Sequence, residues 1–407
     1  MRARGLVDDA GSLTDTGRKT KERVESLTDE LAAPAYDGLD GPISSSSPPP
    51  SRPSPQPSTP PVPGSRAGNG GQAETSLIPG RPAVSMVGMS TRLGSYVEWQ
   101  HAQVSTPRAV LDDLVHRALG TGIDRADRIV DGYSNEVYRV RCRSGQDVVV
   151  RVLRFDDDVT WEVSAGEARV IESARSVGVP APEILWHGMV RMDGSEFPVM
   201  VQGTVSGRPL GEVIGRLSTR ERVDVLTEIG GLVARLNGVH VDDVRDWSTA
   251  MAADLSDRYA RRDTILAGGF SAPEFDRMLD LLEEYVREFP CEQWVLCHGD
   301  LGPKHIFVTG DGDGTVRVSG IIDFGDWKPG APVHDLAVLR VRGPDLELPP
   351  LLAGYGAPSE ERYRRRLNLH TLLVALCSLE IGVDEGDQAC IARSGHLIRT
   401  LVTDLGG

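Results

Sequence analysis

Two aspartates stand at the ends of apolar, strand-like segments in the C-terminal half of this 407-residue chain. The stretch WVLCHGDLGPKHIFV predicts a strand over Trp294–Cys297, followed at once by a His-Gly-Asp loop that contains Asp300. A second strand is predicted over Ile306–Val308, and after a DGDG turn a third, Val316–Ile322, ends at Asp323. This order brings the two carboxylates side by side. Buried carboxylates need a cation or a metal to offset their desolvation.

A pair of carboxylates at strand ends suits the transfer of a phosphoryl group. One carboxylate orients the attacking hydroxyl and accepts its proton, while another holds Mg²⁺ against the phosphates. Either aspartate alone would be interpreted as an ordinary turn residue. The presence of His298, His305 and Asp335 at these offsets favours a catalytic site over that interpretation.

The composition excludes some classes of function. The chain carries 44 basic and 59 acidic residues, a formal charge of −15, which argues against a nucleic-acid partner and fits a cationic or neutral substrate better than a polyanion. Its five cysteines show no pairing or zinc spacing, which indicates a reducing compartment. We find no apolar signal core and no run long enough to span a bilayer. A soluble, cytoplasmic protein without a membrane partner is expected; the oligomeric state is left open.

The chain divides by composition into a tail and a globular part. Residues 1–40 predict a short strand and helix that resemble a remnant of a winged-helix domain. Residues 41–94 are rich in proline, serine and glycine and predict a disordered linker. Strand-like segments fill 95–206 and helical segments 207–407, which predicts an α+β fold with a small β-rich N-lobe and a larger helical C-lobe.

Amphipathic periodicity predicts five helices in the globular part. They are Pro107–Leu119, residues 162–177, Leu226–Leu236, Glu274–Glu288 and Arg366–Ile381.

The motifs HGDLGPKHIFV, IIDFGDW and HDLA resemble the aminoglycoside phosphotransferase family, which has a bilobal protein kinase-like fold. The resemblance implies that Asp300 is the catalytic base and that Asp323 is the metal ligand. It implies structural support from His298, which braces the loop, and from Asp335, which ties the loop to the helical lobe.

The resemblance is less regular in the other parts of the site. His305 stands where the family has a metal-binding asparagine, and imidazole suits Mn²⁺ better than Mg²⁺. Arg151 takes the place of the usual lysine near the phosphates. The remaining residues predicted to bind or support the nucleotide are Ser134, Asn135, Glu167, Gln202 and Thr204. Gly207 is expected to allow the turn from the hinge into the C-lobe.

Together these features predict an ATP-dependent kinase that phosphorylates a hydroxyl of a small polar or aminated molecule, with an aminoglycoside-type antibiotic as one candidate. GTP is not excluded, and Mg²⁺ is the expected metal with Mn²⁺ as the alternative. The resemblance implies that acidic residues of the helical lobe bind acceptor amines, and the candidates are Asp326, Asp345, Glu347, Glu380 and Asp384. Taken singly, each of them is better interpreted as a solvated surface carboxylate. Two alternatives stay open: a metabolite kinase of the same fold, of the choline, homoserine or sugar-amine type, and a degenerate kinase that acts as a nucleotide-binding regulatory module.

Overall fold

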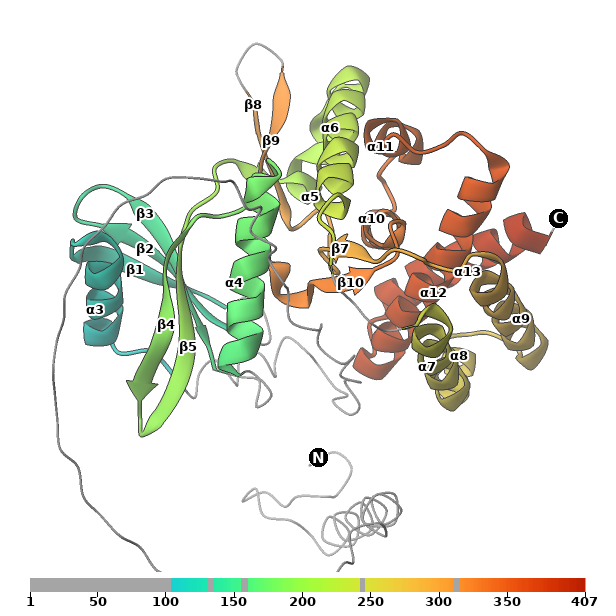
Figure 1. Cartoon of the computed structure of the whole chain (residues 1–407), viewed down its shortest axis with the longest axis horizontal. Helices are drawn as coiled ribbons and strands as arrows, with labels where there is room; N and C mark the ends of the chain where they lie inside the picture. Colours follow the sequence, from blue (N-terminus) through green and yellow to red (C-terminus); the bar gives the residue numbers. More distant parts are fainter. Residues whose placement is uncertain (1–103, 131–134, 155–159, 242–245, 311–314, 407) are drawn as a thin grey trace, which may run out of the picture. The chain divides into compact units, whose positions relative to one another are not determined.

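The computed structural model describes residues 104–406, apart from 131–134, 155–159, 242–245 and 311–314. This part of the chain consists of a β-rich N-lobe followed by a helical C-lobe (Figure 1). The predicted winged-helix-like segment 1–40 and linker 41–94 lie outside the described residues, as does the DGDG turn.

The N-lobe is built on a five-stranded antiparallel sheet with the strand order β1-β2-β3-β5-β4. Its strands are β1 (Ile123–Ile129), β2 (Asn135–Cys142), β3 (Asp147–Leu153), β4 (Ile184–Met192) and β5 (Ser195–Gly203). One helix lies on each side of the sheet, α3 (Arg108–Leu119) and α4 (Trp161–Ser176) (Figure 1). The sheet is therefore covered on both faces.

Strand β3 shows how alternation sorts side chains between the two helices. Val148, Val150 and Val152 are fully buried in one cluster with Leu114 of α3. Because successive side chains of a strand point to opposite faces, Arg151 projects to the other side, toward α4. The strand pattern that buries three valines thus also carries a guanidinium to the catalytic face.

Glu136, on the neighbouring strand β2, anchors the segment that precedes α3. Its buried carboxylate accepts hydrogen bonds from the Thr106 backbone N–H (2.7 Å) and hydroxyl (3.0 Å), and from the Tyr138 hydroxyl. Arg154 also reaches it, with Nη1 at 3.4 Å from Oε2. A buried charge is tolerated here because donors surround it.

The C-lobe is mainly helical around one large core. Its helices are α5 (Leu210–Val213), α6 (Thr219–Asn237), α7 (Trp247–Ala260), α8 (Arg262–Ala267), α9 (Ala272–Glu288), α10 (His334–Arg342), α11 (Leu348–Tyr355), α12 (Glu361–Glu385) and α13 (Gln388–Gly406). Two short sheets run through it, ordered β6-β8-β9 and β10-β7. Their strands are β6 (Arg208–Pro209), β7 (Val295–Cys297), β8 (Ile306–Gly310), β9 (Val316–Ile321) and β10 (Lys328–Gly330).

The predicted elements agree well with those observed. The bilobal α+β fold is confirmed, and the five predicted helices correspond to α3, α4, α6, α9 and α12. Strands β1, β4, β6 and β10 and helices α5, α7, α8, α10, α11 and α13 were not specifically predicted.

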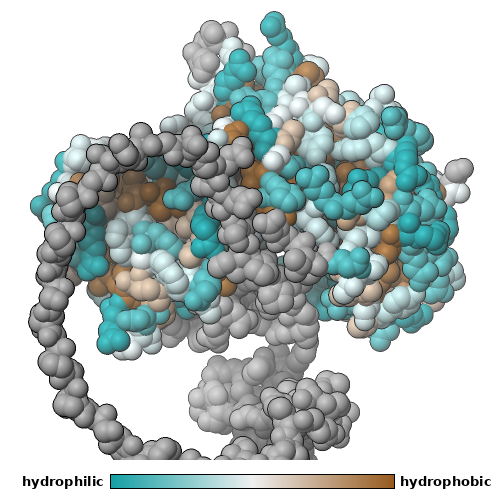
Figure 2. Space-filling view, in the orientation of Figure 1, coloured by the Kyte–Doolittle hydropathy of each residue, from teal (hydrophilic) through white to brown (hydrophobic). Residues whose placement is uncertain are grey.

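Among the described helices, α12 has the length and apolar composition to cross a membrane, but 61% of its apolar window is buried in the C-lobe. Packing accounts for its apolar side chains. Figure 2 shows hydrophilic residues over most of the visible C-lobe surface, with apolar residues in narrow strips between them.

The hinge between the lobes turns at Gly207, as predicted. This residue has φ +94, and a Cβ atom there would lie 2.2 Å from the carbonyl oxygen of Val308. Only glycine allows both the left-handed backbone and this close approach. The hinge is also tied to β9 by the Ser319 hydroxyl, which donates to the Ser206 carbonyl at 2.5 Å.

Candidate active site

Asp335 fixes the loop that carries Asp300. The loop follows strand β7, and Asp335 lies in the first turn of α10 with no exposed surface. Its two carboxylate oxygens accept the backbone N–H groups of His298 (2.9 Å) and Gly299 (3.1 Å). Burial raises the pKa of Asp335 above its ordinary value, although His298 and these two N–H groups act against the rise. The predicted supporting role of Asp335 agrees with this geometry.

His298 ties the same loop to the strand that ends at Asp323. Its Nε2 donates a hydrogen bond to the carbonyl of Ile322 at 3.0 Å, since a carbonyl can only accept. The ring also packs 4.6 Å from that of Phe324, centroid to centroid. Next to it, Gly299 has φ +89, and a Cβ there would lie only 1.9 Å from the Asp326 carbonyl oxygen. The two loops are thus held in direct contact.

A buried chain of hydrogen-bonded polar side chains lies at the start of α10. The Tyr285 hydroxyl is 2.8 Å from Nδ1 of His370, and Nε2 of His370 is 2.9 Å from Nδ1 of His334. Burial lowers the pKa of His370 to about 3, so its ring is neutral and each contact is a hydrogen bond between neutral groups. This chain braces the start of α10 beside Asp335. No local sequence pattern predicts this chain of contacts, because its residues lie far apart in the sequence.

Asp323 occupies a strained backbone position at the end of β9. Its φ of +67 is unusual for a residue with a side chain and is often found at functional sites. Burial alone would raise the pKa of Asp323, but the nearby positive charge, chiefly that of Arg151, outweighs burial and lowers the pKa below its ordinary value. Asp323 is therefore held as a carboxylate.

His305 connects the two aspartates. Its Nδ1 donates to the backbone carbonyl of Asp300 at 2.8 Å, and its Nε2 lies 3.3 Å from Oδ2 of Asp323. Burial lowers the pKa of His305 more than the two carboxylates raise it, so the ring is neutral near pH 7. With the proton on Nδ1, the lone pair of Nε2 faces Asp323.

Arg151 and Glu167 form a buried ion pair between strand β3 and helix α4. Their side chains are 9% and 5% exposed, and Arg151 Nη1 donates to Glu167 Oε1. The other terminal nitrogen, Nη2, lies 3.8 Å from Oδ1 of Asp323. Burial would lower the pKa of Arg151, but the two carboxylates raise it overall. The alternative that Arg151 is an exposed surface residue is therefore wrong.

Asp300 itself is surrounded by positive groups. Nη2 of Arg342, the last residue of α10, lies 2.9 Å from Oδ1 of Asp300. Nζ of Lys304 is 3.9 Å from Oδ2, and the Asp300 side chain is 16% exposed. Neither cation was predicted from the sequence. Lys304 lies within the catalytic motif, and Arg342 lies in the tract RVRGPDLELPPLLAGYG, which follows the motifs and was a candidate lining of the acceptor pocket, but its contact with Asp300 was not predicted.

Ser134 and Asn135 were predicted to lie near the phosphates, and the backbone around Gln202 and Thr204 was predicted to meet the adenine edge. Gln202 is buried in β5 and its side-chain amide donates to the Met200 sulfur at 2.9 Å. The Thr204 hydroxyl donates to the Asp147 carbonyl at 3.5 Å. Asn135 begins strand β2, and Ser134 lies outside the described residues. The predicted roles of these four residues stay predictions.

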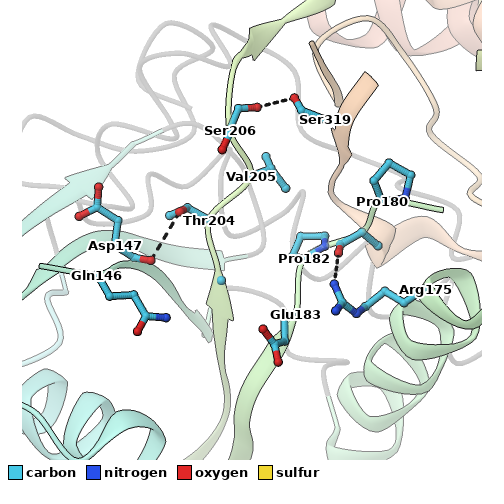
Figure 3. A pocket seen from close by; sticks show the side chains of 12 residues that line it. Gln146, Asp147, Arg175, Pro180, Pro182, Glu183, Thr204, Val205, Ser206 and Ser319 are labelled. Atoms are coloured by element: carbon cyan, nitrogen blue, oxygen red, sulfur yellow. Dashed lines mark hydrogen bonds between the residues drawn. The ribbon is translucent and has the colours of Figure 1, made fainter. Parts of the chain in front are cut away.

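A cavity of about 470 Å³ adjoins the hinge (Figure 3). Its lining includes Thr204, Val205 and Ser206 from the hinge, with Asp147 and Glu183 from the N-lobe. Neither catalytic aspartate lines it, and neither does the Arg151 guanidinium. This cavity is therefore separate from the cluster of catalytic side chains.

Three of the five acidic residues proposed for amine binding are paired with arginines. Glu380 lies 2.7 Å from Arg258 and 2.8 Å from Arg261, and Arg261 also pairs with Asp384. Glu347 is 3.4 Å from Arg222. These carboxylates hold helices of the C-lobe together.

Comparisons with known proteins agree with this geometry. The model of the phosphotransferase enzyme family matches residues 125–370, and that of a helix-turn-helix family matches residues 1–44. A search of curated proteins gives no match.

Three similar solved structures are named as phosphotransferases or as a kinase. The GDP and kanamycin complex of APH(2")-IIia has a TM-score of 0.54 at 19% identity, covering 72% of this chain and 99% of that one. The AMP-PNP and hygromycin B complex of a thermostable aminoglycoside phosphotransferase APH(4)-Ia has a TM-score of 0.50 at 16% identity, covering 73% and 99%. A putative fructosamine-3-kinase from Thermobifida fusca also has 0.50, at 19% identity, covering 71% and 98%. At such identities these structures show the shared fold. Because the family match spans more than half of the sequence, this chain belongs to the phosphotransferase enzyme family, with a protein kinase-like fold.

Proposed function

We propose that this chain transfers the γ-phosphoryl group of ATP to a hydroxyl of a small polar molecule, with Asp300 as the base. The observation that carries the proposal is the arrangement around the two aspartates. His305 lies against both, and Arg151 reaches the second while paired with Glu167. A regulatory module without catalytic activity would not need these contacts, so an active enzyme is favoured.

In the proposed reaction the acceptor hydroxyl donates a hydrogen bond to the Asp300 carboxylate. A bond forms from the hydroxyl oxygen to the γ-phosphorus as the bond to the β–γ bridging oxygen breaks. ADP leaves with that electron pair, and the hydroxyl proton passes to Asp300. The loop contacts of Asp335 keep the base in place, so catalysis rests on positioning and on fixed charges.

The donors at Asp323 fit a metal that is shared with phosphate oxygens. The Asp323 side chain is 48% exposed, and its pKa lies below the ordinary value. The Nε2 lone pair of the neutral His305 ring faces Oδ2 of this carboxylate. The described residues hold no cluster of three side chains that would bind a metal unaided. When bound, Mg²⁺ or Mn²⁺ would neutralise the phosphates, and Asp323 with His305 would hold it.

The nucleotide and the compartment are also part of this proposal. Arg151 would steady the phosphates, and either ATP or GTP would serve as donor. All five cysteines are free thiols, which fits a reducing compartment, and we place the enzyme in the cytoplasm. Kanamycin and hygromycin B, which two of the similar structures contain, belong among the acceptors to assay.

The test is ADP release by the full-length protein across a panel of hydroxylated acceptors, with ATP or GTP and with Mg²⁺ or Mn²⁺. Asp300→Asn should abolish acceptor-dependent release while leaving nucleotide binding intact. Asp263→Asn removes a fully exposed carboxylate and serves as the matched control. Tight nucleotide binding without any acceptor-dependent turnover in the wild type would instead favour the regulatory module.

Resistance and metabolism are separated by a second assay. Expression of a resistance enzyme in a susceptible host would raise the inhibitory concentration of an aminoglycoside. A metabolite kinase would leave every such concentration unchanged while consuming ATP with one cellular substrate.

A further inference from the structure

The charges that meet the catalytic carboxylate differ from those of the molecule as a whole. The chain has a net charge of −15, yet among the described residues the basic side chains within 4 Å of the Asp300 carboxylate are those of Arg342, Lys304 and His305. Arg342 is 43% exposed and Lys304 is 71% exposed, so both can reach a bound molecule. An acceptor whose hydroxyl reaches Asp300 must approach these two cations.

Arg342 extends to Asp300 from a well-supported position. It ends α10, the helix whose first turn holds Asp335, so the same helix fixes the catalytic loop and supplies the guanidinium. Arg342 is also close enough to Glu385 to lower the pKa of that carboxyl, although burial and Asp387 raise it overall. The guanidinium has five donors, and one contact at 2.9 Å leaves others for a second anion.

The acidic side chains that would attract amines have structural partners instead. Glu380, Asp384 and Glu347 pair with arginines. Asp387 caps helix α13, because its Oδ1 accepts the backbone N–H groups of Ala389 (2.9 Å) and Cys390 (3.0 Å). A polyamine would therefore meet two cations at the catalytic carboxylate, while three of the five carboxylates considered for amine binding already pair with arginines.

We propose that the acceptor is a small hydroxylated anion, with a carboxylate or phosphate group close to the reacting hydroxyl, and that Arg342 and Lys304 recognise that group. This proposal rests on the proposed function and names the acceptor class for the same site. In the absence of the acceptor Arg342 pairs with Asp300. When the acceptor binds, its anionic group takes over part of the guanidinium and leaves an Asp300 oxygen to accept the hydroxyl.

The proposed acceptor class is tested with sets of compounds that share one carbon skeleton and differ in their charged group. One set consists of glycerate, glycerol 3-phosphate, glycerol and 3-aminopropane-1,2-diol, and a second of glucuronate, glucose and glucosamine; kanamycin and hygromycin B complete the panel. Binding to the full-length protein saturated with AMP-PNP is measured by calorimetry, and ADP release is measured with ATP. An anion of at least one set should bind or react at least tenfold better than its neutral and aminated counterparts, as expected for one charge-assisted hydrogen bond.

Substitution of Arg342 separates recognition from mere support of the loop. Arg342→Met should lower kcat/KM for the anionic acceptor about tenfold to hundredfold and remove the preference for the anion over its neutral analogue. Arg342→Lys should restore part of that preference. Arg220→Met, at an arginine that is 92% exposed and pairs with Asp224 on α6, is the matched control and should change neither value.

Failure of the proposed function and failure of the acceptor class give different results. Failure to bind ATP or GTP would overturn the proposed function itself. If nucleotide binds, three results would overturn the acceptor class alone: no anion of either set binds, neutral or aminated compounds are preferred, or Arg342→Met lowers turnover of anionic and neutral acceptors equally.

Discussion

Replacement of Arg151 by methionine should destabilise the protein by about 3–5 kcal/mol, the cost of leaving one member of a buried ion pair without its partner. The side chains of Arg151 and Glu167 are only 9% and 5% exposed, so water cannot solvate the remaining carboxylate. Globular proteins have unfolding free energies of about 5–15 kcal/mol, so this loss is a large share of the total.

A second substitution separates the pair from the individual residues. The double variant Arg151→Met, Glu167→Leu replaces both charges with apolar groups of similar size, which is often close to neutral for stability. We therefore expect its free energy of unfolding to recover to within about 1–2 kcal/mol of wild type. Activity should not recover, because no guanidinium or ammonium would remain beside Asp323 for the phosphates. Arg151→Lys should keep most of both.

Urea unfolding followed by the fluorescence of the six tryptophans measures the stabilities, and ADP release measures activity. Equal destabilisation of the single and double variants would refute the reasoning, since it would mean that Glu167 does not depend on Arg151. An unchanged unfolding midpoint for Arg151→Met would refute it as well, because the pair would then not be buried in solution.

Three further predictions concern the rest of the site and the N-lobe. Asp335→Asn turns an amide N–H₂ toward one of the two backbone N–H donors. The free energy of unfolding in urea should therefore fall by about 1–3 kcal/mol, and kcat should fall while nucleotide affinity is kept. An unchanged kcat would contradict the role of Asp335. Burial alone would raise the pKa of Glu136, but its hydrogen-bond donors and nearby arginines lower the pKa by more, so the folded-state pKa lies below the ordinary value. The contribution of Glu136 to protein stability is therefore lost as the pH falls below about 4.5. Glu136→Gln should thus be less stable at pH 7 and flatter in its acid unfolding profile, and a profile parallel to wild type would rule this out. His305→Asn supplies an oxygen in place of nitrogen beside Asp323, so titration of nucleotide affinity with Mg²⁺ and Mn²⁺ should show a shift toward Mg²⁺; no change in the ratio would exclude His305 from the metal site.

The catalytic core was predictable because its residues occur in short local motifs. Asp300 and His305 are five residues apart, and Asp323 follows a strand with a clear apolar pattern. Arg151 was identified because the resemblance places it where the family has a lysine, and the alternation of β3 explains why its side chain reaches Glu167.

Other parts of the site depend on tertiary packing and could not be predicted. Arg342 lies in an ordinary basic turn at the end of a helix, and only the packing of α10 against the loop brings it to Asp300. The acidic candidates illustrate the converse. Glu380 was a reasonable amine ligand until the structure paired it with Arg258 and Arg261. Overall net charge was likewise a poor guide to the charge near Asp300.

The two departures from the motifs of the family are explained together by the structure. Arg151 takes the place of a lysine and His305 that of an asparagine, which taken separately suggested a degenerate site. In space they meet the two oxygens of one carboxylate: Nη2 of Arg151 is 3.8 Å from Oδ1 of Asp323, and Nε2 of His305 is 3.3 Å from Oδ2. A guanidinium keeps the positive charge that the phosphates need, and a neutral imidazole keeps a lone pair facing the metal ligand. Both residues therefore still contact Asp323, which favours a working phosphotransferase over a degenerate one.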